Sequence, residues 1–321
     1  MKTDPSHRLG GQAIPDSTRI GGKTLVPFQV VRPVSLASFW ALVKVEAGQV
    51  VLLTGAPGGL GIFIARRFMS LGVRLALVAH TADELERITS VLGELKDGVH
   101  AFVADLREAT QRRDLIARVQ SVLGPVDILI NNAGVEFNSY YHELDESQIE
   151  EVITVNLLAA MSLSRLVLPE MLTRGRGHIV NISSLAGKSG PAFQEPYAAS
   201  KAGLVAFTMS FRASYRRFGV SASVVVPGFV ETGIYSRLKT LAGRPAPFFL
   251  APCSPERVAN AVVDVIQRDS PEVIVNRYPI RFLLALAVLS PSFGEWVCGK
   301  LGTHKFFEAA AFRRGTGLYG Q

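Results

Sequence analysis

The stretch VVLLTGAPGGLG, residues 50–61, decides the fold of this chain. Its first four residues form an apolar run of the kind found in strands that are buried on both faces. A glycine-rich turn follows, and then a helical pattern begins near Ile62. Glycines let the backbone approach a pyrophosphate, and the first turn of a helix offers free N–H groups. The stretch therefore predicts a dinucleotide-binding turn, although a tight turn with positive φ angles would give the same pattern.

Strand and helix patterns alternate along the following two hundred or so residues. The predicted strands cover residues 50–53, 74–79, 99–104, 126–130, 178–182, 220–226 and 272–275. The predicted helices cover residues 82–95, 107–123, 147–173, 195–218 and 255–268. This alternation predicts an α/β fold with a Rossmann-type doubly wound parallel sheet, whose ligands bind at the carboxyl ends of the strands.

Composition divides the chain into three expected parts. Residues 1–47 contain scattered glycines and prolines and predict a flexible or wrapping N-terminal arm, within which residues 35–45 could form a short amphipathic helix. Residues 48–276 form the predicted catalytic domain. Residues 277–321 are apolar and basic and predict a helical tail.

Charge and cysteine content exclude several classes of protein. The net charge is +7, but the basic residues are scattered, so we expect no nucleic-acid binding. Cys253 and Cys298 are isolated, which predicts neither a metal site nor a disulfide framework. The N-terminus has no apolar segment typical of a secretory signal, and the apolar run 282–289 is shorter than the roughly 20 residues that span a bilayer. We therefore predict a cytoplasmic protein.

Tyr197 and Lys201 are four residues apart in a predicted helix, so their side chains share one face. A tyrosine hydroxyl has a free pKa of about 10, and a neighbouring ammonium group should lower that pKa toward the working range. Ser184, thirteen residues upstream, could hold a substrate oxygen against the phenol. The three groups suit proton transfer to or from that oxygen while a hydride moves at carbon. On its own, however, such a pair is common on exposed helices.

Further polar motifs follow the predicted strands. Asn131-Asn132-Ala133-Gly134 follows the fourth strand, Ser183-Ser184 the fifth and Pro227-Gly228 the sixth. Together with the glycine-rich turn, Asn156 and the pair Tyr197/Lys201, these motifs in this order resemble the short-chain dehydrogenase/reductase family. The resemblance covers roughly residues 48–276 and implies a Rossmann-type fold, a nicotinamide dinucleotide and oxidoreductase activity.

The resemblance also implies roles for individual residues. Tyr197 would be the general acid in reduction and the base in oxidation, and Lys201 would lower its pKa and hold the nicotinamide ribose. Ser184 would hold the substrate oxygen, and Asn156 would support a water that relays protons to Lys201. Without the other motifs, Asn156 would be interpreted as an ordinary mid-helix residue bonded to backbone. The implied catalytic residues are Asn156, Ser184, Tyr197 and Lys201. The implied cofactor-binding residues are Thr54, Gly55, Gly59, Leu60, Gly61, His80, Asp105, Asn132, Ala133, Gly134, Tyr197, Lys201, Pro227, Gly228, Val230 and Thr232.

Departures from the family pattern bear on the choice of cofactor. Pro57 has no N–H to offer a phosphate, which removes a single donor. No acidic residue follows the second strand, where it would bond the ribose 2′-hydroxyl and repel a 2′-phosphate. Its absence, together with His80, favours NADP(H) over NAD(H), although Gly58 stands where members that use NADP often carry a basic residue. Asp105 would lie by the adenine or cap the next helix.

The segment after Gly228 suggests the nature of the substrate. Its apolar residues predict a lid over a lipophilic alcohol or ketone of retinoid, steroid or fatty-chain type, unless they simply pack on the domain. The tail suits peripheral contact with a membrane, a helix over the pocket mouth or a subunit contact, and the family leads us to expect a homo-oligomer. Two alternatives stay open: a 3-oxoacyl thioester reductase acting on an acidic carrier, and a non-catalytic dinucleotide-sensing or scaffold protein.

Overall fold

The computed structural model describes residues 44–93 and 98–315 of the chain, all within the compact unit Pro33–Gln321. Its centre is a seven-stranded sheet in the order β3-β2-β1-β4-β5-β6-β7, in which every pairing is parallel. The strands are β1 (Val50–Thr54), β2 (Arg74–Ala79), β3 (Val99–Val103), β4 (Ile128–Asn131), β5 (Gly177–Ile182), β6 (Val220–Pro227) and β7 (Glu272–Val275). The order reverses between β1 and β4, which is the switch point where such sheets bind ligands.

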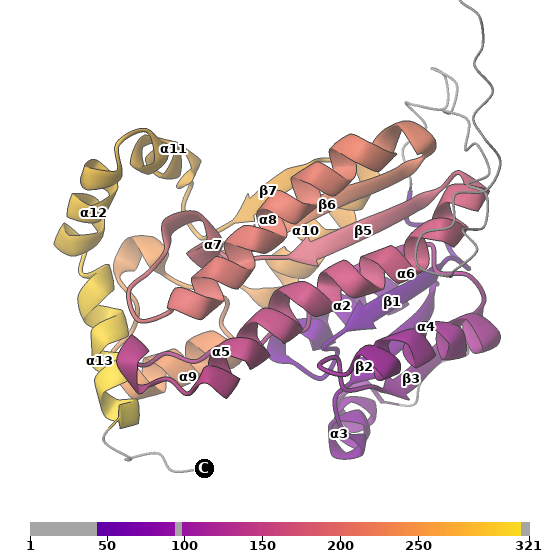
Figure 1. Cartoon of the computed structure of the whole chain (residues 1–321), viewed down its shortest axis with the longest axis horizontal. Helices are drawn as coiled ribbons and strands as arrows, with labels where there is room; N and C mark the ends of the chain where they lie inside the picture. The colour runs from indigo at the N-terminus through magenta and orange to yellow at the C-terminus, as the bar shows by residue number, and fades with distance from the viewer. Residues whose placement is uncertain (1–43, 94–97, 316–321) are drawn as a thin grey trace, which may run out of the picture. The chain divides into compact units, whose positions relative to one another are not determined.

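Helices cover both faces of the sheet (Figure 1). On one face lie α2 (Gly59–Met69), α3 (Ala82–Leu92) and α10 (Pro255–Gln267). On the other lie α4 (Ala109–Leu123), α6 (Ala159–Arg174) and α8 (Glu195–Tyr215). The remaining helical segments are η1 (Tyr141–Glu143), α5 (Glu146–Ile153), η2 (Thr154–Leu158), α7 (Ala186–Ser189), η3 (Arg216–Phe218), α9 (Gly233–Ala242), η4 (Phe248–Leu250), α11 (Arg281–Leu289), α12 (Pro291–Lys300) and α13 (Thr303–Gly315).

Alternation of side chains along each strand builds two hydrophobic cores. Val51 and Leu53 of β1 point to the α2/α10 face, whereas Val50 and Leu52 point to the α4/α6/α8 face. Because both faces are covered, residues 50–53 of β1 are all apolar, and this explains the uniform apolar run in the sequence.

The C-terminal helices gather at one end of the described unit. In Figure 1, α11 and α12 form a hairpin at the left edge, and α13 runs back beside α9. The α9/α13 contact is apolar and includes Tyr235 and Leu238 from α9 and Phe306 and Phe307 from α13. We call α9, α11, α12 and α13 the C-terminal cover.

The observed fold confirms the predicted Rossmann-type doubly wound sheet, with a helical tail. Strand bounds agree within two residues, and Arg74–Ala79 and Glu272–Val275 agree at both ends. The long helix predicted over residues 147–173 is wrong in one respect, because a π-helical segment, Thr154–Leu158, interrupts it. The expectations for residues 1–43 lie outside the described residues, and 44–46 contain no regular element.

One helical run in the described ranges, Glu146–Arg174, is long and apolar enough to cross a membrane by length and composition. Core helices pass the same test. Leu163, Val167 and Met171 of this run are buried against the sheet, so its apolar character is accounted for by the core.

Candidate active site

The glycine-rich turn leads from β1 into α2 at the switch point of the sheet. Gly55 has φ +63°, and a Cβ there would lie 2.7 Å from Cα of Ala133, so the turn needs glycine for its angle and for its close approach to the β4 loop. The hydroxyl of Thr54 accepts hydrogen bonds from the backbone N–H groups of Asn132 and Ala133 at 3.0 and 3.1 Å. The two loops are thus fixed together beside the N-terminus of α2.

Tyr197, Ser184 and Lys201 meet at the carboxyl edge of β5. The hydroxyl of Ser184 is hydrogen-bonded to the phenol of Tyr197. Lys201 is buried, donates to the carbonyl of Ile182 at 2.9 Å, and has Nζ 5.6 Å from the centre of the Tyr197 ring. The neighbouring Ser183 turns away and donates to the carbonyl of Lys201 at 2.8 Å. Of the two serines, only Ser184 therefore faces the phenol.

Burial dominates the protonation of this pair. It raises the pKa of Tyr197 to about 12, although the hydrogen bond from Ser184 acts in the opposite direction. Burial also lowers the pKa of Lys201 to about 8. The lowered tyrosine pKa expected from the sequence spacing is absent here, because desolvation outweighs the nearby charges. In this state Tyr197 is a protonated donor.

Asn156 lies in the π-helical segment η2, and its amide connects three parts of the site. Its Oδ1 accepts from the N–H of Val135 at 2.8 Å, and its Nδ2 donates to the Val135 carbonyl and to Ser200 Oγ at 2.9 and 3.0 Å. A Cβ on Gly134 would lie 3.3 Å from Asn156 Oδ1 and 3.4 Å from Lys201 Nζ, so both side chains face this glycine. π-Helical bulges often occur at functional sites because they re-aim a side chain. We call Asn156, Tyr197, Ser200 and Lys201 the catalytic network, after the role predicted for three of them, Asn156, Tyr197 and Lys201.

A cavity of about 610 Å³ runs along the carboxyl edge of the sheet, from the end of β2 to α9. The predicted site residues that line it are Gly55, Gly59, Leu60, His80, Asp105, Asn132, Ala133, Gly134, Ser184, Tyr197, Lys201, Pro227, Gly228, Val230 and Thr232. Thr54, Gly61 and Asn156 stand behind its wall instead. Thr54 braces the β4 loop, and Gly61 lets α2 approach the turn, since a Cβ there would lie 2.3 Å from the Gly55 carbonyl oxygen.

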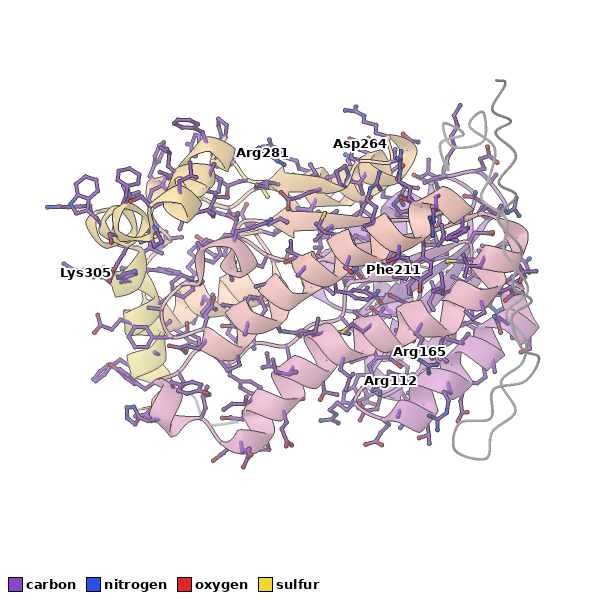
Figure 2. All side chains as sticks on the ribbon, turned by 45° about the horizontal axis from the view of Figure 1, so that its top comes forward. Arg112, Arg165, Phe211, Asp264, Arg281 and Lys305 are labelled. Atoms are coloured by element: carbon purple, nitrogen blue, oxygen red, sulfur yellow. The ribbon has the colours of Figure 1, made fainter. Side chains whose placement is uncertain are left out.

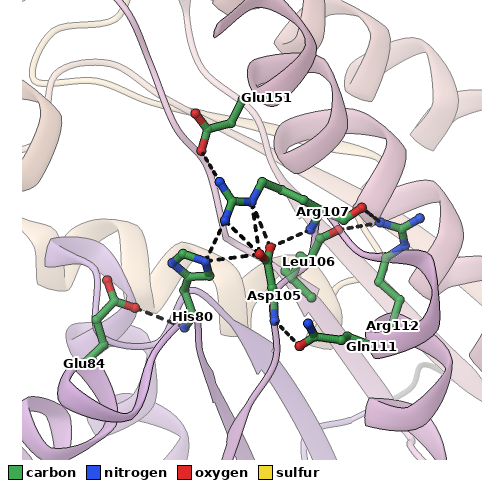
Figure 3. A network of polar contacts seen from close by, with 8 residues as sticks. All are labelled: His80, Glu84, Asp105, Leu106, Arg107, Gln111, Arg112 and Glu151. Carbon is green, nitrogen blue, oxygen red and sulfur yellow. Dashed lines mark hydrogen bonds and ion pairs between the residues drawn. The ribbon is translucent and has the colours of Figure 1, made fainter. Parts of the chain in front are cut away.

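A charged network closes the β2/β3 end of this cavity (Figure 3). The guanidinium of Arg107 contacts both carboxylate oxygens of Asp105 at 2.8–3.1 Å, Nε2 of His80 at 3.2 Å and a carboxylate oxygen of Glu151 at 3.3 Å. Arg107 holds the pKa of Asp105 well below its usual range, at about 2. Asp105 does not cap α4, whose N-cap is Glu108, but its carboxylate accepts the N–H of Arg107 at 2.9 Å.

A buried carboxylate, Glu136, lies behind the opposite end of the cavity, whose lining there includes Gln194 and Arg237. Glu136 accepts from Nε2 of Gln194 at 2.8 Å and forms an ion pair with Arg237 of α9. Arg237 also donates to the Glu136 carbonyl at 3.0 Å. This pair ties the loop after β4 to the C-terminal cover, next to Tyr197.

A second, smaller cavity of about 110 Å³ adjoins Ser184 and extends under the α11–α12 hairpin. Its lining is mostly apolar: Leu185, Phe229, Leu250, Ile280, Leu283, Leu284, Ala287, Val297 and Phe307 are among its residues, with Cys298 and Thr303 at the tail side. Residues of the segment after Gly228 both pack on the domain and line the two cavities. Tyr235 and Leu238 pack against α13 and also line the larger cavity, whereas Phe249 and Leu250 line the smaller one.

Comparisons with known proteins define the class. A family profile described as short chain dehydrogenase matches residues 49–241. The chain is 38% identical over 273 residues to the ketoacyl reductase HetN of Nostoc sp. strain PCC 7120, covering 83% of this chain and 94% of HetN. The chain belongs to the short-chain dehydrogenase/reductase family and is an oxidoreductase.

Two solved structures agree with this assignment. A metagenomic short-chain oxidoreductase in complex with NADP has 32% identity and a TM-score of 0.60, covering 74% of this chain and 100% of its own. An actinorhodin polyketide ketoreductase variant with NADPH has 29% identity and a TM-score of 0.66, covering 72% and 97%.

Proposed function

We propose that this protein is an NADPH-dependent reductase of the ketone group in a lipophilic, acyl-chain-like substrate, with the 3-oxoacyl thioester as the preferred form. The observation that carries the proposal is the meeting of Ser184, Tyr197 and Lys201 beside the glycine-rich turn in one cavity. The ketoacyl reductases among the relatives favour the 3-oxoacyl form. An acidic carrier protein that bears the thioester would suit the net charge of +7.

The protonation state of the pair supports the reductive direction. Bound NADPH would supply a hydride to the carbonyl carbon. Ser184 would hold the carbonyl oxygen, and Tyr197 would donate its proton to that oxygen as the alcohol forms. Lys201 would hold the nicotinamide ribose, and Asn156 would fix the loop at Val135 and support the water that returns a proton. A tyrosine with a pKa of about 12 stays protonated at neutral pH, as this role requires.

The substitution Tyr197→Phe tests this mechanism. We expect turnover to fall by at least about 10²-fold, because the proton donor is lost, while NADPH binding followed by nicotinamide fluorescence stays unchanged. A variant that retains most of its activity would refute the mechanism. A chain that binds NADPH but reduces no carbonyl in a broad panel would instead be the dinucleotide-sensing or scaffold alternative.

We propose NADP(H) over NAD(H), and Arg107 as the main contact of the 2′-phosphate. The residues fit the cofactor, since Gly55 and Gly59 leave no side chain in the turn and α2 begins there. His80 directly follows β2, Arg107 stands shortly after β3, and no carboxylate directly follows β2. A 2′-phosphate would replace the Asp105 carboxylate as the partner of the Arg107 guanidinium. Asp105 would then be free to bond the adenine amino group.

Arg107→Ala tests the cofactor assignment, with the exposed Arg113→Ala in the following helix α4 as its control. We expect the Kd of NADPH to rise about tenfold and the Kd of NADH to stay the same, because only NADPH carries the 2′-phosphate. The fragment 2′,5′-ADP should lose affinity in parallel with NADPH. Equal effects on NADPH and NADH would contradict the assignment.

The second cavity supports a substrate with an apolar chain. It begins at Ser184, so a carbonyl held there could direct its chain under α11 and α12. Cys298→Phe should fill this space and lower kcat/KM for long 3-oxoacyl chains about tenfold more than for short ones, whereas Cys298→Ser adds no volume and serves as the control. Equal losses for long and short chains would remove the chain-binding role.

A free lipophilic alcohol or ketone of retinoid or steroid type is the second candidate, which the same apolar cavity favours. A panel of 3-oxoacyl thioesters and of free ketones and alcohols, assayed with each cofactor, separates the two. Efficient turnover of small polar ketones would reject both.

We propose the following setting for the enzyme. Residues 48–276 form the catalytic domain, the arm 1–47 and the tail 277–321 flank it, and the protein is cytoplasmic with the tail in peripheral contact with a membrane.

Exposed Leu158 and Met161, at the start of α6, support a homo-oligomer through the long helices. Sedimentation of a Leu158→Asp/Met161→Asp variant as a smaller species would support this contact.

A further inference from the structure

The α11–α12 hairpin is apolar on its outer surface as well as on its inner one. Phe282, Val288 and Leu289 of α11 are 77%, 72% and 81% exposed, and Trp296 of α12 is 59% exposed. The ring of Phe293 lies 5.9 Å from that of Trp296. Scattered apolar residues are ordinary on a protein surface, but several large exposed ones on two adjoining helices point to an interaction site.

The inner surface of the same hairpin is already in use. Leu283, Leu284 and Ala287 of α11 and Val297 and Cys298 of α12 line the cavity that reaches Ser184. A Cβ on Gly294 would lie 2.8 Å from Cβ of Ala287, so the two helices pack closely and the hairpin is a defined unit. A helix that is apolar all round is normally buried, yet α11 has no buried residue. Its outer surface therefore lacks a partner among the described residues.

We propose that the outer surface of the α11–α12 hairpin docks on an anionic lipid bilayer, so that the cavity behind it opens toward the lipid. The inference rests on the proposed membrane contact and names its surface, its lipid charge and its relation to the substrate cavity. Nine residues of helix extend only about 14 Å, so α11 cannot span a bilayer and would lie in its interface. Tryptophan and phenylalanine are typical of that depth.

Charge selects a bilayer over a second copy of the chain. Between residues 277 and 308 stand four basic side chains, Arg277, Arg281, Lys300 and Lys305, against two acidic ones, Glu295 and Glu308. Arg281 also pairs with Glu272 at 3.6 Å, and the balance stays positive when that carboxylate is included. Figure 2 shows Arg281 and Lys305 near the hairpin, at the start of α11 and in α13. Anionic headgroups would attract these cations to the bilayer surface. A twofold contact would instead set this net positive surface against its own copy.

Vesicle co-sedimentation of the full chain tests the proposal without any turnover, so its result is independent of the proposed reaction. We expect the wild-type protein to sediment with phosphatidylcholine vesicles that contain about one-third phosphatidylglycerol, and much less with phosphatidylcholine alone. Phe282→Asp/Val288→Asp should lower the bound fraction at least about fivefold. The control Val91→Asp/Val122→Asp places the same charges on exposed valines of α3 and α4 and should bind like the wild type.

A second variant separates charge from apolar contact. Lys300→Glu/Lys305→Glu should weaken binding to the anionic vesicles and leave the weak binding to neutral ones unchanged. Circular dichroism and NADPH binding must match the wild type in each variant. The proposal is overturned if the wild-type protein stays in solution with both kinds of vesicle, or if Phe282→Asp/Val288→Asp sediments as the wild type does. Loss of an oligomer in that variant, with no vesicle binding by the wild type, would assign the hairpin to a subunit contact instead.

Discussion

The catalytic network and the C-terminal cover are built by opposite means. In the network the polar groups are buried and each is held by named partners: Lys201 by the Ile182 carbonyl, Ser200 by the Tyr197 carbonyl and Asn156 by Val135. The cover relies mainly on aromatic and aliphatic packing, and its polar contacts to the body include the Arg237–Glu136 ion pair and the hydrogen bond from Asn138 to the Phe307 carbonyl. The difference teaches that the side chains predicted to take part in proton transfer are each fixed by hydrogen bonds, whereas the cover is held mainly by the fit of apolar side chains.

Lys201→Met should have the largest effect, because it removes a member of the catalytic network that is also a buried charge. We expect turnover to fall by at least about 10²-fold, while the free energy of unfolding at pH 7 rises by about 1–3 kcal/mol. The gain follows from the removal of a buried ammonium and is reduced by the lost bond to Ile182. Steady-state kinetics and urea unfolding measure the two changes. Lys188→Met, which loses a lysine paired with Glu272 instead, should not gain stability.

The pH dependence of the Lys201 effect has a defined sign. The folded-state pKa is about 8 and the ordinary value is 10.5, so the folded wild-type protein binds fewer protons between these values. Its free energy of unfolding therefore rises as the pH increases through this window. The variant lacks this rise, so its advantage should be full below pH 8 and shrink toward pH 10. An advantage that is constant from pH 7 to 10 would show that the lysine is not buried in its charged form.

The sequence predicted the network and the sheet far better than the cover. Strand ends, the glycine-rich turn and the spacing of Tyr197 and Lys201 are local signals, because a helix brings residues four apart to one face. The parallel sheet then brings the separate strand ends to one edge. The roles of Ser184, Tyr197 and Lys201 in binding and catalysis remain predictions. That these residues and the glycine-rich turn line one cavity follows from the fold.

The residues that sequence reasoning missed have distant partners. Arg237 is 101 positions from Glu136 and gives no local sign of that pair. The tyrosine pKa was also misjudged, because spacing reports the nearby ammonium but not the depth of burial. Arg107, by contrast, stands two positions after Asp105 and could have been found as a second charge at the end of the third strand.

Glu136→Gln should have the next largest effect. It breaks the ion pair with Arg237 that ties the loop after β4 to α9 of the C-terminal cover. We expect a loss of about 1–2 kcal/mol in the free energy of unfolding and a rise in substrate KM, with the Kd of NADPH unchanged. Arg237→Gln and the double variant complete a cycle. The double variant should lose no more than Glu136→Gln alone, because the pair acts as a unit. Additive losses would show that the two side chains are not coupled.

Phe229→Leu should have a smaller effect confined to the cover. Its ring lies 4.9 Å from that of Tyr235, 5.7 Å from Phe306 and 6.0 Å from Phe307, and so it joins α9 to α13. Leucine keeps most of the volume and loses these ring contacts, which costs about 1 kcal/mol. Thermal unfolding would measure the loss. The kcat should change less than the KM for long-chain substrates, because the ring lines both cavities but does not belong to the catalytic network.

Phe248→Ala should have the smallest effect and sets the limit of the comparison. Phe248 is 76% exposed and stacks on Tyr278 with ring centres 4.8 Å apart. Removing a ring that solvent already reaches leaves no sealed cavity, so the free energy of unfolding should change by less than about 0.5 kcal/mol. If the cover is held by its buried aromatic residues, turnover of short substrates should also stay the same. A larger loss would mean that exposed aromatic pairs also hold the cover in place. The cover and the catalytic network would then differ in the kind of contact that holds them, apolar or polar, and not in the strength of those contacts.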